Sequence, residues 1–130
     1  MGEARLPAGK KSRLGAALLF AALGLLPAQA LAHASLVKSS PPQRATLHRA
    51  PQKIELCFNE RLEPRYSSFT VVDAKDKAVE TGPVEVAADE PRRLSAAVKS
   101  LGPGRYTVRY RVLSTDGHIV QGSFAFIVRQ

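Results

Sequence analysis

Three residues of this chain have the types and positions expected of metal ligands. Asp116 and His118 lie two positions apart in the segment STDGH, with Gly117 between them. Residues i and i+2 of an extended chain face the same side, and a glycine also permits a turn, so the carboxylate and the imidazole can converge. The third residue, His33, lies far away in the sequence, directly after the segment LPAQALA.

The segment before His33 has the composition of a secretory signal. It begins with basic side chains, continues as an uncharged apolar run over residues 14–26, and ends in small residues. We therefore expect residues 1–32 to be a cleaved signal peptide and residues 33–130 to form one exported domain. The apolar run is shorter than the roughly 20 residues of a transmembrane helix, and no second run follows, so we expect no membrane-spanning segment.

Two cleavage sites fit the requirement for small residues three and one positions before the cut. Ala28 and Ala30 permit a cut before Leu31, and Ala30 and Ala32 permit a cut between Ala32 and His33. The pattern alone leaves both sites open. Only the second one makes His33 the first residue, with two metal-binding nitrogens, its α-amine and its ring Nδ1. An α-amine with a pKa of about 8 can lose its proton to a metal at neutral pH.

The donor set predicted in this way consists of the His33 amine, the His33 ring, the His118 ring and an oxygen of Asp116. Nitrogen and oxygen donors in a tetragonal arrangement suit Cu(II), and we expect one ion per chain. Zinc is the main competitor, although it prefers a tetrahedron. A histidine or an Asp-Gly pair in a loop is usually an ordinary polar feature. We assign the remaining histidine, His48, to the surface.

Short strands must position these residues. Period-two alternation of apolar and polar side chains is clearest in GRYTVRYRVLS, KIELCFNE and IVQGSFAFIVR, and Pro- or Gly-containing turns separate the segments. The expected strands are 35–39, 53–60, 67–73, 78–81, 93–99, 104–114 and 119–129. About seven short strands without a helical period predict an all-β fold, an antiparallel β-sandwich.

The charge and the single cysteine limit the possible partners and covalent bonds of the chain. The chain has 19 basic and 11 acidic residues, a net charge of +8, and residues 33–130 retain 15 and 10, or +5. This balance is a weak argument for nucleic acid, and we expect no nucleic-acid partner. Arg105, Arg109 and Arg111 form a basic stripe, either a solvated strand face or a docking surface for an acidic partner or a membrane protein. The single cysteine, Cys57, excludes an internal disulfide, and we expect it to be a structural thiol under a loop or at a sheet edge.

The chain from His33 onward resembles the CopC copper-resistance proteins of bacteria. The resemblance rests on HASLVKSSPP, on KIELCFNE and above all on LGPGRYTVRYRVLSTDGHIVQGSFAFIV. It implies a cupredoxin-like, immunoglobulin-like Greek-key sandwich with a Cu(II) site that includes His33, Asp116 and His118. It also places Glu60, the last residue of KIELCFNE, near the metal, either as a weak ligand or as a carboxylate that orients one of the ligands. The site favours cleavage between Ala32 and His33.

The function implied by this resemblance is that of a periplasmic Cu(II) carrier or buffer in copper resistance and homeostasis. We expect a monomer without enzymatic activity that delivers copper to an inner-membrane CopD-type transporter. Some family members also bind Cu(I) through methionines, but the only methionine here is Met1, so we expect no such site. The alternatives are a metal-free, immunoglobulin-like interaction module and a copper monooxygenase with an N-terminal histidine. The second is disfavoured by the short chain without tryptophan.

Overall fold

The computed structural model describes Gly2 and residues 35–130. The expected signal peptide, the cleavage site before His33 and His33 itself lie outside these residues. Within them, no helix is long and apolar enough to cross a membrane.

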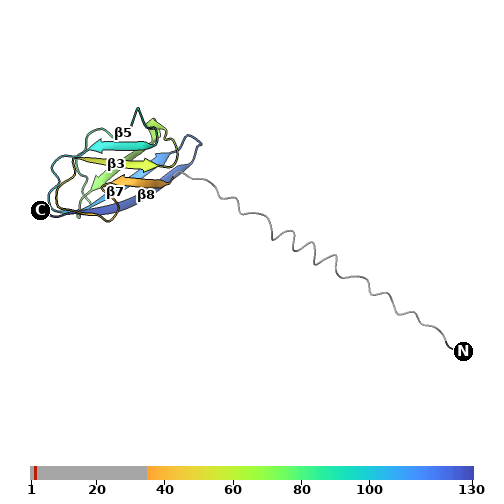
Figure 1. The fold of residues 1–130 in the computed structure, drawn as a ribbon, viewed down its shortest axis with the longest axis horizontal. Helices are drawn as coiled ribbons and strands as arrows, with labels where there is room; N and C mark the ends of the chain where they lie inside the picture. Colours follow the sequence, from red (N-terminus) through yellow and green to blue (C-terminus); the bar gives the residue numbers. More distant parts are fainter. Residues whose placement is uncertain (1, 3–34) are drawn as a thin grey trace. The chain divides into compact units, whose positions relative to one another are not determined.

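Two four-stranded sheets form the domain (Figure 1). The first sheet has the order β1 (Leu36–Ser40), β3 (Lys53–Phe58), β6 (Arg93–Ala97) and β5 (Glu85–Val86). The second has the order β2 (Thr46–Leu47), β8 (Ile119–Val128), β7 (Gly104–Leu113) and β4 (Ser68–Val72). A single turn of 3₁₀ helix, η1 (Pro64–Tyr66), leads into β4.

The strand order confirms the predicted Greek-key sandwich. The sheets correspond to the ABED and GFC sheets of an immunoglobulin-type fold, with β1 and β2 as the two halves of a divided first strand. Near the start of β7 the Tyr106 hydroxyl donates a hydrogen bond to the Gly102 carbonyl at 2.8 Å, as tyrosines do at the corner of such sandwiches. This topology makes β7 and β8 the longest hairpin of the domain.

Three details of the predicted strands are wrong. The described residues contain eight strands, and two of them, β2 and β5, were not predicted. Each of these has only two residues, which is too short to show an alternating pattern. The expected strand 78–81 is absent, and only isolated bridges join Ala78 to Val72 and Thr81 to Val98. The pairing is also mixed, since β2 runs parallel to β8.

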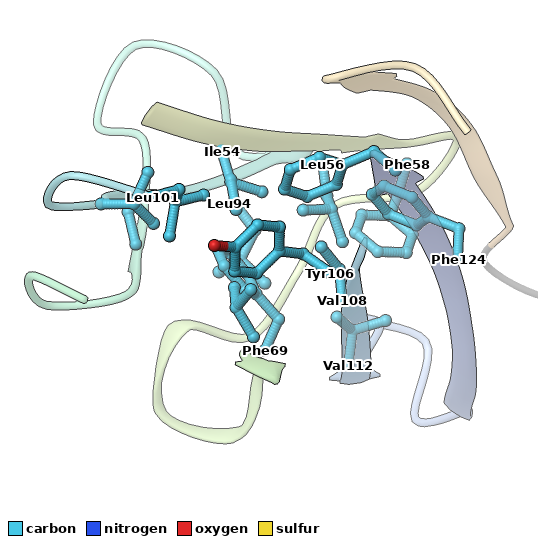
Figure 2. Packing of buried hydrophobic residues seen from close by; sticks show 14 of the residues in the cluster. Ile54, Leu56, Phe58, Phe69, Leu94, Leu101, Tyr106, Val108, Val112 and Phe124 are labelled. Carbon is cyan, nitrogen blue, oxygen red and sulfur yellow. The ribbon is translucent and has the colours of Figure 1, made fainter. Parts of the chain in front are cut away.

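A single apolar core fills the space between the sheets (Figure 2). It takes alternate residues of the long strands, as the periodicity predicts. The fully enclosed side chains include Ile54 and Leu56 from β3, Leu94 from β6, and Val108 from β7. Phe126 of β8 is the largest of them. This core fixes the register of β7 and β8, and therefore the position of the turn between them.

A glycine supports the end of the sandwich at which β3 stops. Gly122 of β8 faces Tyr110 of β7 in the register, and a Cβ at position 122 would overlap the tyrosine ring and hydroxyl. The Tyr110 ring in turn packs edge-on against Phe58, with 5.5 Å between the ring centroids. Burial raises the pKa of the Tyr110 hydroxyl. Gly122 thus leaves the space in which Tyr110 supports the last residue of β3.

We expect Gly122→Ala to lower the free energy of unfolding by about 1–3 kcal/mol, the usual cost of overpacking. Chemical denaturation measures this loss. Gly102→Ala is the matched control, because a Cβ at position 102 meets nothing within 4 Å. If Gly122→Ala costs the same in a Tyr110→Leu background, the overlap with the ring is not the cause.

Candidate metal centre

The turn between β7 and β8 brings Asp116 and His118 together, as the sequence predicts. The Ser114 amide donates a hydrogen bond to the His118 carbonyl at 2.9 Å, and the Gly117 amide donates one to the Ser114 carbonyl at 2.9 Å. Gly117 has a φ of 93°, which side chains rarely allow. Within this closed turn, His118 Nδ1 lies 3.1 Å from Asp116 Oδ1. Both side chains remain about half exposed, so a solute ion can reach them.

The Asp116 carboxylate is held through one of its two oxygens. Oδ1 accepts hydrogen bonds from the Ser114 hydroxyl, from the His118 amide at 3.2 Å and from the His118 ring. The Ser114 hydroxyl, followed by His118, lowers the pKa of Asp116 below its ordinary value. The group is therefore a carboxylate at neutral pH, as a metal ligand must be. Within the described part of the chain, Oδ2 accepts no hydrogen bond and keeps its lone pairs for another partner.

A short segment after β3 connects this turn with the start of the domain. The Ser35 amide donates to Asn59 Oδ1 at 2.6 Å, and the Asn59 amide donates back to the Ser35 carbonyl at 3.1 Å. Two residues later, the Arg61 carbonyl accepts a hydrogen bond from the Thr115 amide at 2.9 Å. Residues 59–61 thus lie between the first residue of the domain that the structure describes and the turn with Asp116.

Glu60 lies in the middle of this connecting segment and is partly exposed. The neighbours on both sides of it, Asn59 and Arg61, make the backbone contacts with Ser35 and Thr115. The described residues alone do not test the predicted role of Glu60, because His33 lies outside them. Among Gly2 and residues 35–130, no three side chains of His, Cys, Asp or Glu come together in an arrangement that could hold a metal ion.

The other two candidate donors lie apart from the turn. His48 is exposed after β2, as expected of a surface residue. Cys57 is a free, partly buried thiol on β3. It does not lie at a sheet edge, one of the two predicted positions, because β3 is an inner strand and Cys57 is paired with Lys38 on one side and Arg93 on the other.

Two residues of the candidate centre were not predicted from the sequence, Ser114 and Asn59. Ser114 is only 1% exposed, and its hydroxyl fixes the Asp116 carboxylate. Asn59 anchors Ser35 through its side chain. A serine two positions before an aspartate in a tight turn is a usable signal for the first contact. The second joins residues 24 positions apart and has no local signal.

Comparison with known proteins places this chain in a family. The model of the CopC domain matches residues 36–129. Copper resistance protein C of Xanthomonas campestris pv. juglandis is 36% identical over 118 residues, which cover 86% of this chain and 92% of that protein. The copper transport protein CutJ of Bacillus subtilis is 33% identical over 112 residues, which cover 85% of this chain and 20% of CutJ.

A solved structure agrees with the sequence comparison. The crystal structure of CopC from Methylosinus trichosporium OB3b superimposes with a TM-score of 0.69 at 40% identity, and the match covers 74% of this chain and 93% of that one. The relatives named here are copper resistance and copper transport proteins. The chain therefore belongs to the CopC family of copper resistance proteins.

Proposed function

We propose that this protein is exported to the periplasm, binds one Cu(II) ion at the end of the sandwich near the β7–β8 turn, and carries or buffers it. The single observation that supports the proposal best is the Asp116–His118 pair. The carboxylate is ionised, both groups are half exposed, and the hydrogen bonds of Ser114 hold them in place before any metal binds. Carboxylate oxygen and imidazole nitrogen suit Cu(II).

The remaining donors are proposed to come from His33 after cleavage between Ala32 and His33. His33 precedes Ser35 by two residues, a reach of at most about 7 Å of backbone. Ser35 is bound to Asn59, which belongs to the same short segment that contacts Thr115. An amine and a ring nitrogen at position 33 can therefore reach the end of the domain with Asp116 and His118. Glu60 lies in this segment and is proposed to stand behind the ligands or to bind weakly.

The partner is proposed to be a membrane transporter of the CopD type. A domain like this one forms a fifth of the copper transport protein CutJ, which supports a role beside a larger transport protein. We propose a monomer that exchanges Cu(II) alone. Thioether ligands for Cu(I) are missing, because the only methionine of the chain, Met1, belongs to the expected signal peptide.

The metal content of the exported protein tests this function against the metal-free interaction module. Protein isolated from the periplasm of copper-supplemented cells, and analysed by native mass spectrometry, is expected to carry one copper per chain. Asp116→Asn serves as the matched variant, because it keeps the side-chain shape and removes the charge. Wild-type protein that arrives without copper, and takes up none when Cu(II) is added, would favour the interaction module.

Copper binding is expected to weaken below about pH 5, because protons then compete for the imidazole and amine nitrogens. Asp116 does not cause this loss. Its pKa lies below the ordinary value, so the carboxylate becomes protonated only at a lower pH than the imidazole and the amine. Competition titrations with a Cu(II) chelator of known affinity at each pH measure the effect. An affinity that stays constant down to about pH 4 would contradict nitrogen ligation.

A further inference from the structure

The outer face of the second sheet carries arginines and no acidic side chain. Strands β4, β7 and β8 contain neither Asp nor Glu. On β7 the side chains of Arg105, Arg109 and Arg111 are exposed, while alternate residues such as Val108 are buried in the core. Six residues of strand separate the first arginine from the last, or roughly 20 Å. We call this surface the arginine face.

Two shallow hollows on the arginine face are lined by hydrogen-bond donors. Arg109 and Arg111 border a hollow of about 260 Å³, whose lining also includes Ser68, Thr70, Tyr110 and Gln121. A second hollow of about 140 Å³ lies between Arg105 and Arg44, with Ala125 and Ile127 below them. The Arg44 amide donates to the Ala125 carbonyl at 2.7 Å, which fixes that arginine beside β8. Guanidinium, hydroxyl and amide groups together suit an oxyanion.

The positive charge of this face is largely uncompensated. The turn at residues 73–77 beside it holds two acids and two lysines, so it adds no net charge. Asp76 pairs with Arg109 at 2.5 Å, and Asp73 accepts hydrogen bonds from amides of its own turn. Within the part of the chain that the structure describes, Arg44, Arg105 and Arg111 form no ion pair.

Several basic side chains of the first sheet and its borders are neutralised by carboxylates. Three of them form ion pairs, whereas Lys38 and Arg92 form none among the described residues. These pairs are Lys53–Glu55, Arg93–Asp89 and Lys99–Glu80. The strands of the first sheet hold three basic and two acidic residues, against three arginines and no acidic residue in the second sheet, so a partner with negative charge meets the stronger attraction at the arginine face.

We propose that the arginine face docks on the anionic phospholipid headgroups of a membrane. A guanidinium binds a phosphate through two parallel hydrogen bonds, and the basic residues within strands β4, β7 and β8 are all arginines. The arginines are spread over about 20 Å of sheet rather than gathered in one deep pocket, which matches a planar array of headgroups. The inference is independent of copper binding. It places the β7–β8 turn, three residues after Arg111, next to the membrane surface.

Co-sedimentation with lipid vesicles tests this docking. We expect the protein, as cells export it, to bind vesicles with about 30% phosphatidylglycerol in phosphatidylcholine at low ionic strength. It should not bind vesicles of pure phosphatidylcholine, and about 0.5 M NaCl should release it, because salt screens exposed charges. Failure to bind the anionic vesicles at low salt would overturn the proposal.

Three variants connect the binding to this face. Arg105→Gln/Arg111→Gln should lower the partition onto anionic vesicles roughly thirty-fold, since each arginine near such a leaflet contributes about one kcal/mol. Arg92→Gln/Lys99→Gln, which removes two charges from the other side, should lower it much less. Asp76→Asn should raise it, because it releases Arg109, and asparagine tolerates the positive φ of 63° at this position.

Two outcomes would count against a lipid surface. Equal losses in both double variants would show that overall charge, and not the arginine face, drives the binding. If the wild-type protein binds immobilised poly-glutamate but not the vesicles, the partner of the arginine face is an acidic protein and not a lipid surface. Copper titrations of the same samples keep a failure of docking separate from a failure of the proposed metal site.

Discussion

Substitution of His118 by alanine is expected to lower the Cu(II) affinity more than about 100-fold. Loss of a group that merely supports a metal ligand already costs roughly 10- to 100-fold, and His118 is proposed to be a ligand itself. The fold should survive. The backbone of His118, not its ring, closes the turn through the Ser114 amide, and its own amide still reaches Asp116. A change at a half-exposed side chain usually alters stability by no more than about 0.5 kcal/mol.

Competition titration and thermal unfolding of the same sample separate the two effects. His48→Ala is the matched control, because it removes an exposed imidazole that lies outside the candidate centre. A wild-type affinity in the His118→Ala protein would remove His118 from the site. A large loss of stability would mean that the ring supports the turn, and the affinity would then have to be measured again with His118→Gln.

A protein with one glycine in front of His33 is expected to lose Cu(II) affinity by a factor similar to that expected for His118→Ala. The addition leaves the imidazole in the sequence but moves the free amine to another residue, so the His33 amine and Nδ1 no longer hold one ion in a chelate. A protein that begins at Leu31 should behave in the same way. Equilibrium dialysis against a Cu(II) chelator measures the change.

The control for this effect is a glycine added after Gln130, which is exposed and lies outside the candidate centre. It should leave the affinity unchanged. If the glycine in front of His33 also leaves it unchanged, the α-amine is not a ligand. The copper would then have to be bound by the side chains of the folded domain alone.

Alternation of apolar residues predicted most of the fold because the sandwich buries one face of each long strand. Val108 and Val112 of β7 and Phe126 of β8 are completely or almost completely buried, as the period of two requires. The strands β2 and β5 could not be predicted in this way. Two residues carry no period, and these strands exist because longer neighbours offer them backbone partners.

The candidate centre was predictable only in its local part. Asp116 and His118 are two residues apart, so their convergence depends on one turn and on Gly117. The contact of Asn59 with Ser35 depends on the pairing of β1 with β3, which no local pattern reveals. Ser114 was overlooked because an apparently ordinary polar turn residue proved to be buried.

The proposal that His33, Asp116 and His118 bind one Cu(II) ion is tested most directly by the intact mass of the exported protein combined with a Cu(II) titration followed by electron paramagnetic resonance. We expect the mass of a chain that begins at His33 and one equivalent of Cu(II) in a tetragonal, nitrogen-rich environment. The mass of a chain that begins at Leu31, or a chain beginning at His33 that takes up no copper, would contradict this proposal. The turn with Asp116 and His118 would then be a hairpin connection without a metal.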